Sequence, residues 1–257
     1  MVSIFSCFLI SSAPALGGNC TLADLDAGRG ERIAVQYAYD GDTLTLSDGR
    51  RIRLIGINTP ERGRKGQPDE ALALAAKQAV QSALQASGAR QRDLRLVLGR
   101  EQTDAYGRQL GYVFIDGQSL SALLLKQGLG WHVAIPPNLG LLPCFVGAEK
   151  SARRGQKGLW QSTLAQYVGA KNIERGGYQR VRGTVRKVSF AKAWWINFED
   201  GFVAVIYPEN QRYFDKATVN SWRGKRLEVE GWVYSSKYRG KPQWRIKLAT
   251  PHGLSVL

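Results

Sequence analysis

The sequence contains few of the residues that build redox, zinc and histidine-dependent sites. Its 257 residues include three cysteines, two histidines and one methionine. No cysteine belongs to a CxxC pair, which disfavours a zinc or redox site. His132 and His252 lack the spacing of a metal-binding or catalytic pair, which disfavours enzymes that use a phosphohistidine or an HNH-type histidine base. GxSxG, P-loop and HExxH motifs are also missing, so the sequence does not indicate a serine hydrolase, a P-loop nucleotidase or a zinc protease.

Acidic residues are scarce relative to basic ones. There are 21 Asp and Glu against 36 Lys and Arg, which gives a net charge of +15 and an isoelectric point near 10.0. Such a charge attracts polyanions, namely nucleic acid, acidic glycans or anionic membrane surfaces, although it also serves general solubility. With 44% hydrophobic and 22% charged residues, the composition is that of a soluble globular protein of one large or two ordinary domains.

No apolar run is long enough to cross a bilayer as a helix. Residues 1–15 carry no charge and end in Ala13-Pro14-Ala15, which matches the small-x-small pattern of a signal-peptidase site. A buried N-terminal strand is the alternative interpretation. We expect 1–15 to be a signal peptide and the mature protein to be secreted or periplasmic, without membrane insertion. Removal of Cys7 would leave Cys20 and Cys144, which we hypothesise form a disulfide in that oxidising environment.

An α+β domain is predicted for residues 31–161, after a polar N-terminal arm at 16–30. Asp48-Gly49 is a hairpin turn between two alternating strands, and Arg53 should face away from its apolar neighbours on the second of them. Further strands are expected near 94–98 and 110–115. Three helices are expected at 69–87, 119–127 and 143–154, the first with acidic residues in its first turn. This order predicts a small barrel with helices packed on it.

Residues 162–177 lack periodicity and are interpreted as a linker to a second domain at 178–257. There the pattern predicts three strands, a helix at about 211–221 and two more strands, which is the order expected for a small OB-like β-barrel. This domain is the more basic one and interleaves aromatic and basic residues, as single-strand-binding OB folds do. Many of these aromatics could equally belong to the core, but Trp232 and Tyr234 alternate with the apolar Val229 and Val233 and should lie on the outer face.

Three short clusters carry residues suited to hydrolysis of a phosphodiester, which needs a cation, an oriented water and donors for the phosphoryl oxygens. Residues 40–43 read Asp-Gly-Asp-Thr, and residues 53–61 read Arg-Leu-Ile-Gly-Ile-Asn-Thr-Pro-Glu. Residues 104–108 read Asp-Ala-Tyr-Gly-Arg. Each cluster alone could be an ordinary turn or loop, whereas all three in this order indicate a site.

The three clusters, with Gln127-Gly128-Leu129 and Gly158-Leu159-Trp160, resemble the pattern of the staphylococcal-nuclease (thermonuclease) family. The resemblance covers about residues 31–161. It implies a five-stranded OB-like barrel with three helices, a Ca²⁺ cofactor, and hydrolysis of DNA and RNA. It also implies cleavage of the 5′ P–O bond to leave 3′-phosphates. We expect a monomer.

The resemblance assigns the metal site to two of the clusters. Asp42 and the backbone carbonyl of Thr59 become direct ligands, with Asp40 close by. Asn58 departs from the family pattern, which typically has a metal-binding Asp there. Its amide oxygen can still bind calcium, but the loss of a formal charge should weaken the binding.

The resemblance also assigns the catalytic and substrate-binding residues. Arg53 and Arg108 would grip the scissile phosphate, which a planar guanidinium contacts through two oxygens at once. Glu61 would orient or deprotonate the attacking water. Tyr106 is expected to contact substrate, and Trp131 either replaces the tyrosines that stack on the substrate base in the family or belongs to the core.

A non-catalytic nucleic-acid binder with a degenerate site is the main alternative, favoured only by Asn58. A polyanion or glycan binder would explain the charge but not the three clusters.

Overall fold

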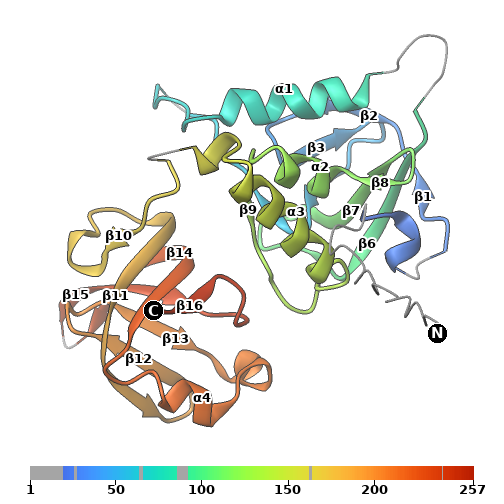
Figure 1. Cartoon of the computed structure of the whole chain (residues 1–257). Helices are drawn as coiled ribbons and strands as arrows, with labels where there is room; N and C mark the ends of the chain where they lie inside the picture. The colour runs from blue at the N-terminus through green and yellow to red at the C-terminus, as the bar shows by residue number, and fades with distance from the viewer. Residues whose placement is uncertain (1–19, 26–27, 64–65, 86–91, 162–163, 239) are drawn as a thin grey trace, which may run out of the picture.

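The structure is a computed structural model of the chain that describes residues 20–25, 28–63, 66–85, 92–161, 164–238 and 240–257 (Figure 1). The predicted signal peptide at 1–15 lies outside the described residues. Within these ranges, no helix is both long and apolar enough to cross a membrane.

Five ladders build the first barrel. The sheet runs in the order β1-β6-β7-β4-β3-β2, where β3 (Thr43–Leu46), β4 (Arg51–Leu54), β6 (Leu94–Thr103) and β7 (Gln109–Ile115) are its main strands. The short β1 (Glu31–Arg32) and β2 (Val35–Ala38) are consecutive pieces of one segment that pairs with β6 at one end and β3 at the other. This segment closes the ring, so the predicted five-stranded barrel with three helices is confirmed.

Two features of the sequence determine the strand that carries Arg53. Gly49 has a φ of 88°, which permits the tight turn between β3 and β4. Along β4, Ile52 and Leu54 are buried in the core while Arg53 points the other way, as alternation predicts. β4 pairs with β7 in parallel, and Arg53 is opposite Leu110.

The three helices pack around this barrel: α1 (Ala73–Leu84), α2 (Leu120–Lys126) and α3 (Leu142–Arg154). Short elements complete the domain, namely η1 (Leu22–Leu25), β5 (Ile57–Asn58), β8 (Gln118–Ser119), β9 (Trp131–His132) and η2 (Gly158–Trp160). The predicted start of the first helix at residue 69 is wrong. The acidic residues at 69 and 70 precede α1, which has no acidic residue in its first turn, because both side chains bind the preceding loop instead.

Cys20 and Cys144 form a disulfide, which confirms the hypothesised bridge. It links the start of the described chain to the first turn of α3.

The second barrel is formed by β11 (Gly177–Phe190), β12 (Trp194–Phe198), β13 (Val203–Ile206), β14 (Arg226–Tyr238) and β15 (Lys241–Lys247). They pair in the order β11-β12-β13-β15-β14, and β14 pairs back to β11, so the barrel is closed. η4 (Pro208–Tyr213) and α4 (Lys216–Asn220) lie between the third and fourth strands. These are the strand number and helix position predicted for an OB-like barrel, although the predicted single helix is divided in two.

The predicted linker at 162–177 is wrong in its second half. β10 (Val168–Gly169) pairs with β11, and Ala170 in η3 (Ala170–Asn172) and Ile173 are buried in the core of the second barrel. These short elements have no repeating apolar pattern, and their composition is therefore that of a linker. β16 (Leu254–Val256), which pairs with β14, was not predicted either.

Aromatic residues of the second barrel divide between core and surface. Five are buried in the core, namely Trp194, Phe198, Phe202, Phe214 and Trp222, and most of the others are partly buried. Trp232 lies on the outer face of β14 and is 42% exposed, while Val229 and Val233 point inward. The alternation therefore predicted the face correctly.

Candidate active site

Residues 40–43 form a buried turn between β2 and β3. An Asp40 Oδ1 accepts hydrogen bonds from the backbone N–H groups of Asp42 at 3.0 Å and Thr43 at 2.7 Å. Both carboxylates are almost fully buried. Burial raises the pKa of Asp40, and the negative charge of Asp42 raises it further. The cluster is thus both a turn and a pair of adjacent carboxylates.

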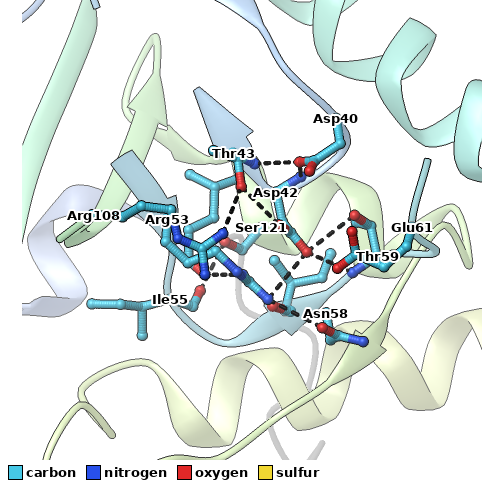
Figure 2. A network of polar contacts seen from close by, with 12 residues as sticks. Asp40, Asp42, Thr43, Arg53, Ile55, Asn58, Thr59, Glu61, Arg108 and Ser121 are labelled. Atoms are coloured by element: carbon cyan, nitrogen blue, oxygen red, sulfur yellow. Dashed lines mark hydrogen bonds and ion pairs between the residues drawn. The ribbon is translucent and has the colours of Figure 1, made fainter. Parts of the chain in front are cut away.

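Asp42 connects this turn to the segment that follows β4. Its Oδ2 accepts hydrogen bonds from the backbone N–H of Thr59 at 2.8 Å and from the Thr59 hydroxyl at 3.0 Å. The same oxygen lies 3.1 Å from Nη2 of Arg53. Two of the three clusters therefore meet at one carboxylate (Figure 2).

The Arg53 guanidinium is fixed by backbone and amide oxygens. Nη1 donates to the carbonyls of Leu54 at 2.8 Å and Ile57 at 2.7 Å, and Nη2 donates to Oδ1 of Asn58 at 3.2 Å. Its side chain is only 12% exposed. These contacts fix the plane of the guanidinium before any ligand binds, because each of its N–H groups has a set direction.

Arg108 reaches the same turn from the third cluster. Its Nε donates to Oδ2 of Asp104 at 2.7 Å, and its Nη1 donates to the Thr43 hydroxyl at 3.2 Å. The Thr43 hydroxyl in turn lies 3.2 Å from Oδ1 of Asp42. Arg108 immediately precedes β7, which pairs in parallel with β4, the strand that carries Arg53. Figure 2 shows both guanidinium groups directed at residues 42 and 43.

Glu61 lies in a loop whose backbone N–H groups donate hydrogen bonds to two acidic side chains. Its backbone N–H donates to Oε2 of Glu70 at 3.0 Å, and the Glu70 N–H donates to the Glu61 carbonyl at 3.0 Å. Asp69 accepts from the Gly63 N–H at 2.8 Å and pairs with Arg62 at 2.8 Å. The sequence analysis did not predict that these two acidic residues bind the loop, because acidic residues just before a helix are also typical of its first turn.

A cavity of about 800 Å³ joins the predicted residues. Asp40, Arg53, Asn58, Glu61, Tyr106 and Arg108 all line it, whereas Asp42 and Thr59 are buried next to the residues that do. The ring of Tyr106 is 84% exposed, and the Arg108 guanidinium lies 5.5 Å from its centroid. The structure thus brings together residues from all three clusters.

Trp131 is not among the residues that line this cavity. Its strand β9 pairs with β5, where Trp131 is opposite Asn58. Its ring stacks on Tyr178 of the second barrel, with centroids 5.8 Å apart and planes 21° apart. The structure therefore places Trp131 at the boundary between the barrels, where its ring contacts Tyr178 and lies outside the cavity lining.

Several residues that line the cavity were not predicted as site residues from the sequence, among them Arg51, Tyr39 and Trp232. Arg51 lies two residues before Arg53 on the same face of β4, and its guanidinium is 5.5 Å from the ring centroid of Tyr39. Strand alternation could have identified Arg51. Trp232 belongs to the second barrel, and no local pattern places it beside residues 53–61.

The oxygen atoms around Asp42 fit a hard cation. Carboxylate, amide and carbonyl oxygens are the ligands that calcium and magnesium prefer, and a cation would relieve the repulsion that raises the pKa of Asp40. Among the described residues, no three His, Cys, Asp or Glu side chains come together. A cation here would therefore need oxygens of Asn58 and Thr59 in addition to the two carboxylates.

Comparison with known proteins identifies the first barrel. The family model described as staphylococcal nuclease homologue matches residues 51–162. The thermonuclease of Staphylococcus intermedius is 35% identical over 136 residues, which are 52% of this chain and 78% of that protein. The thermonuclease of Staphylococcus hyicus is 28% identical over 54% of this chain and 82% of its own length. Endonuclease YncB of Bacillus subtilis is 26% identical over 51% of this chain and 62% of its own length.

Proposed function

This chain belongs to the staphylococcal nuclease family, and from that premise we propose that it is a metal-dependent endonuclease that hydrolyses DNA and RNA. The observation that carries the proposal is the convergence of Arg53 and Arg108 on the Asp42–Thr43 turn, from separate clusters, at one cavity. Two guanidiniums beside buried carboxylates suit a phosphoryl group better than any neutral ligand. The names of the thermonuclease and endonuclease relatives support the same reaction class.

The two arginines bind and polarise the phosphate. A guanidinium has five N–H donors, and the contacts of Arg108 with Asp104 and Thr43 use only part of them. The remaining N–H groups of Arg108 are available to phosphoryl oxygens, whereas Arg53 uses Nη1 and Nη2 for the contacts described above. Because these contacts already orient the group, little reorganisation accompanies charge development in the transition state.

Glu61 is the base in this proposal. It lies on the cavity wall, where it accepts a proton from the attacking water as the water oxygen bonds to phosphorus. The bond between phosphorus and the 5′ oxygen breaks, the 5′ oxygen takes up a proton from solvent to become a hydroxyl, and the other product keeps a 3′-phosphate. Reciprocal hydrogen bonds with Glu70 hold the Glu61 backbone in place.

Asp40, Asp42, Asn58 and the carbonyl of Thr59 would hold the cation, which we propose is Ca²⁺. When bound, it would neutralise phosphate charge. With two carboxylates and an amide, the site carries less negative charge than one with Asp at position 58, so its calcium affinity should be correspondingly modest.

The disulfide supports a place of action outside the cytosol, because such bonds persist in oxidising compartments. We propose that the protein acts as a monomer in the periplasm or outside the cell. The second barrel, with its basic residues, adds affinity for the substrate strand.

Incubation of the purified protein with plasmid DNA and with RNA, first with calcium and then with chelator, tests the proposal. We expect chelator-sensitive degradation, and products that a polymerase extends only after phosphatase treatment. Retardation of nucleic acid in a gel without cleavage would instead indicate the non-catalytic binder that Asn58 favours.

A further inference from the structure

The second barrel contributes an aromatic side chain to the cavity of the first. Trp232 on β14 lines the cavity together with Asn58, Glu61 and Tyr106. It is 42% exposed. Trp232 is outside the region that the family model matches. Its place at the cavity therefore depends on how the two barrels contact each other.

A row of four aromatic rings leads from Trp232 into the boundary between the barrels. Trp232 packs edge-on against Tyr178, with centroids 5.2 Å apart and planes at 85°. Tyr178 stacks on Trp131, and Trp131 meets Trp160 edge-on at 5.1 Å. We call these four residues the aromatic row. Since Trp131 pairs with Asn58, the row connects the cavity wall to the second barrel.

Buried ionic contacts fix the strand that carries Trp232. The Glu230 carboxylate, two residues earlier on β14, lies 3.0 Å from Arg180 and 3.3 Å from Arg153 of α3, and it accepts a hydrogen bond from the Tyr167 hydroxyl at 3.0 Å. Only 5% of the Glu230 side chain is exposed. Arg153 also pairs with Glu149 of its own helix at 3.0 Å. These contacts hold β14 against the first barrel and so keep Trp232 at the cavity.

We propose that Trp232 is a stacking platform for a nucleobase of a single-stranded substrate, next to the phosphate bound by Arg53 and Arg108. The inference rests on the proposed nuclease function for the identity of that phosphate. A nucleotide is the ligand that presents an aromatic plane and a phosphate together, and the cavity offers an exposed indole beside guanidinium groups. Its volume of about 800 Å³ lies in the range of small-molecule sites. Stacking on an indole tolerates every base, which suits a nuclease without sequence preference.

Binding measurements with Trp232→Ala, Trp232→Phe and a control test the proposal. Tyr238→Ala is the control, because Tyr238 lies on the same strand, is 55% exposed and does not line the cavity. The probe is a fluorescent oligothymidylate in chelator, so that binding is measured without cleavage. Since stacking contributes about 1–3 kcal/mol per base, we expect Trp232→Ala to raise Kd by roughly 5- to 150-fold. Trp232→Phe should recover most of this loss, and Tyr238→Ala should bind like the wild type.

Two further readouts separate stacking from charge and from simple disruption. The dependence of log Kd on log salt should be the same in Trp232→Ala as in the wild type, because no phosphate contact is lost. An abasic oligonucleotide of equal length should bind the wild type and Trp232→Ala equally. An unchanged Kd in Trp232→Ala, a loss that persists with the abasic probe, or a wild type that does not bind would overturn the proposal. Base-dependent binding without cleavage in calcium would instead refute the nuclease function alone.

Discussion

Trp131 and Tyr178 stack across the boundary between the two barrels, with ring centroids 5.8 Å apart. Each also has a strand partner that belongs to the cavity wall. Trp131 is opposite Asn58 in the β5–β9 pair, and Tyr178 is opposite Trp232 in the β11–β14 pair. The stacking between the barrels therefore involves the direct strand partners of two residues that line the cavity.

Replacement of Arg53 or Arg108 by lysine should abolish most activity. Arg53→Lys and Arg108→Lys keep the charge but lose the planar fork and its fixed hydrogen bonds. We expect turnover to fall on the order of a hundredfold in each, measured as initial rates on a labelled oligonucleotide. Arg50→Lys is the matched control, since Arg50 forms ion pairs with Glu31 and Asp48 outside the cavity. Near-normal turnover of both cavity variants would contradict the assignment.

Glu61 and Glu70 should differ in how their loss affects turnover. Glu61→Ala removes the proposed base and should lower kcat on the order of a hundredfold or more. Glu70→Ala removes the acceptor for the Glu61 N–H, and the resulting displacement should lower kcat on the order of tenfold. Glu70→Gln retains an acceptor oxygen and should restore activity. If Glu70→Gln is as impaired as Glu70→Ala, Glu70 does not act by positioning the loop.

Addition of a carboxylate at position 58 should strengthen calcium binding. Asn58→Asp restores a formal charge beside Asp40 and Asp42, and we expect the calcium Kd to fall on the order of tenfold. Isothermal titration measures this without reference to activity. Asn220→Asp makes the same change in net charge at an exposed position of the second barrel and should leave the Kd unchanged. Equal calcium affinity in Asn58→Asp and the wild type would remove Asn58 from the metal site.

The two histidines should make the protein less stable in mild acid. Burial lowers the pKa of His132 well below its usual value, and the nearby His252 lowers it further. Burial also lowers the pKa of His252. A histidine with a lowered pKa binds its proton more readily when unfolded. Its contribution to stability is therefore complete above about pH 6.5 and is lost as the pH falls below that value.

Urea denaturation between pH 8 and pH 5 measures this effect. We expect the free energy of unfolding to fall on the order of 1 kcal/mol per histidine across that range, and His132→Gln with His252→Gln to remove the fall. Burial raises the pKa of Glu149, so this carboxyl changes stability in the opposite direction, and the comparison with the double variant corrects for it. The same slope in both proteins would contradict the prediction.

Local patterns predicted most of the strands and helices of the first barrel, whereas the resemblance to the staphylococcal-nuclease family assigned the residues of its candidate site. Strand alternation predicted that Arg53 faces away from Ile52 and Leu54, and the Asp-Gly pair predicted the hairpin turn. Both predictions depend only on neighbours in the sequence. The predicted start of α1 was wrong because Glu70 binds Glu61 across a loop. The sequence pattern does not distinguish that contact from a helix cap.

Contacts between the barrels could not be predicted in this way. Trp131 was considered either a substrate platform or a core residue, and it instead stacks on Tyr178. The approach of Trp232 to the cavity depends on the Glu230–Arg153 pair, whose residues are 77 positions apart. No periodicity within one element encodes such a pair. The short β10 and η3 were likewise stabilised by the second core rather than by a pattern of their own.

Helix α3 bears the covalent link at one end and the inter-barrel ion pairs at the other. Cys144 in its first turn is joined to Cys20, and Arg153 in its last turn holds Glu230. About 14 Å of helix separates the two residues, and this helix is packed on the first barrel through Phe145 and Ala148. The disulfide and the ion pairs therefore restrain the same helix from its two ends, and through Glu230 that helix also restrains the strand that carries Trp232.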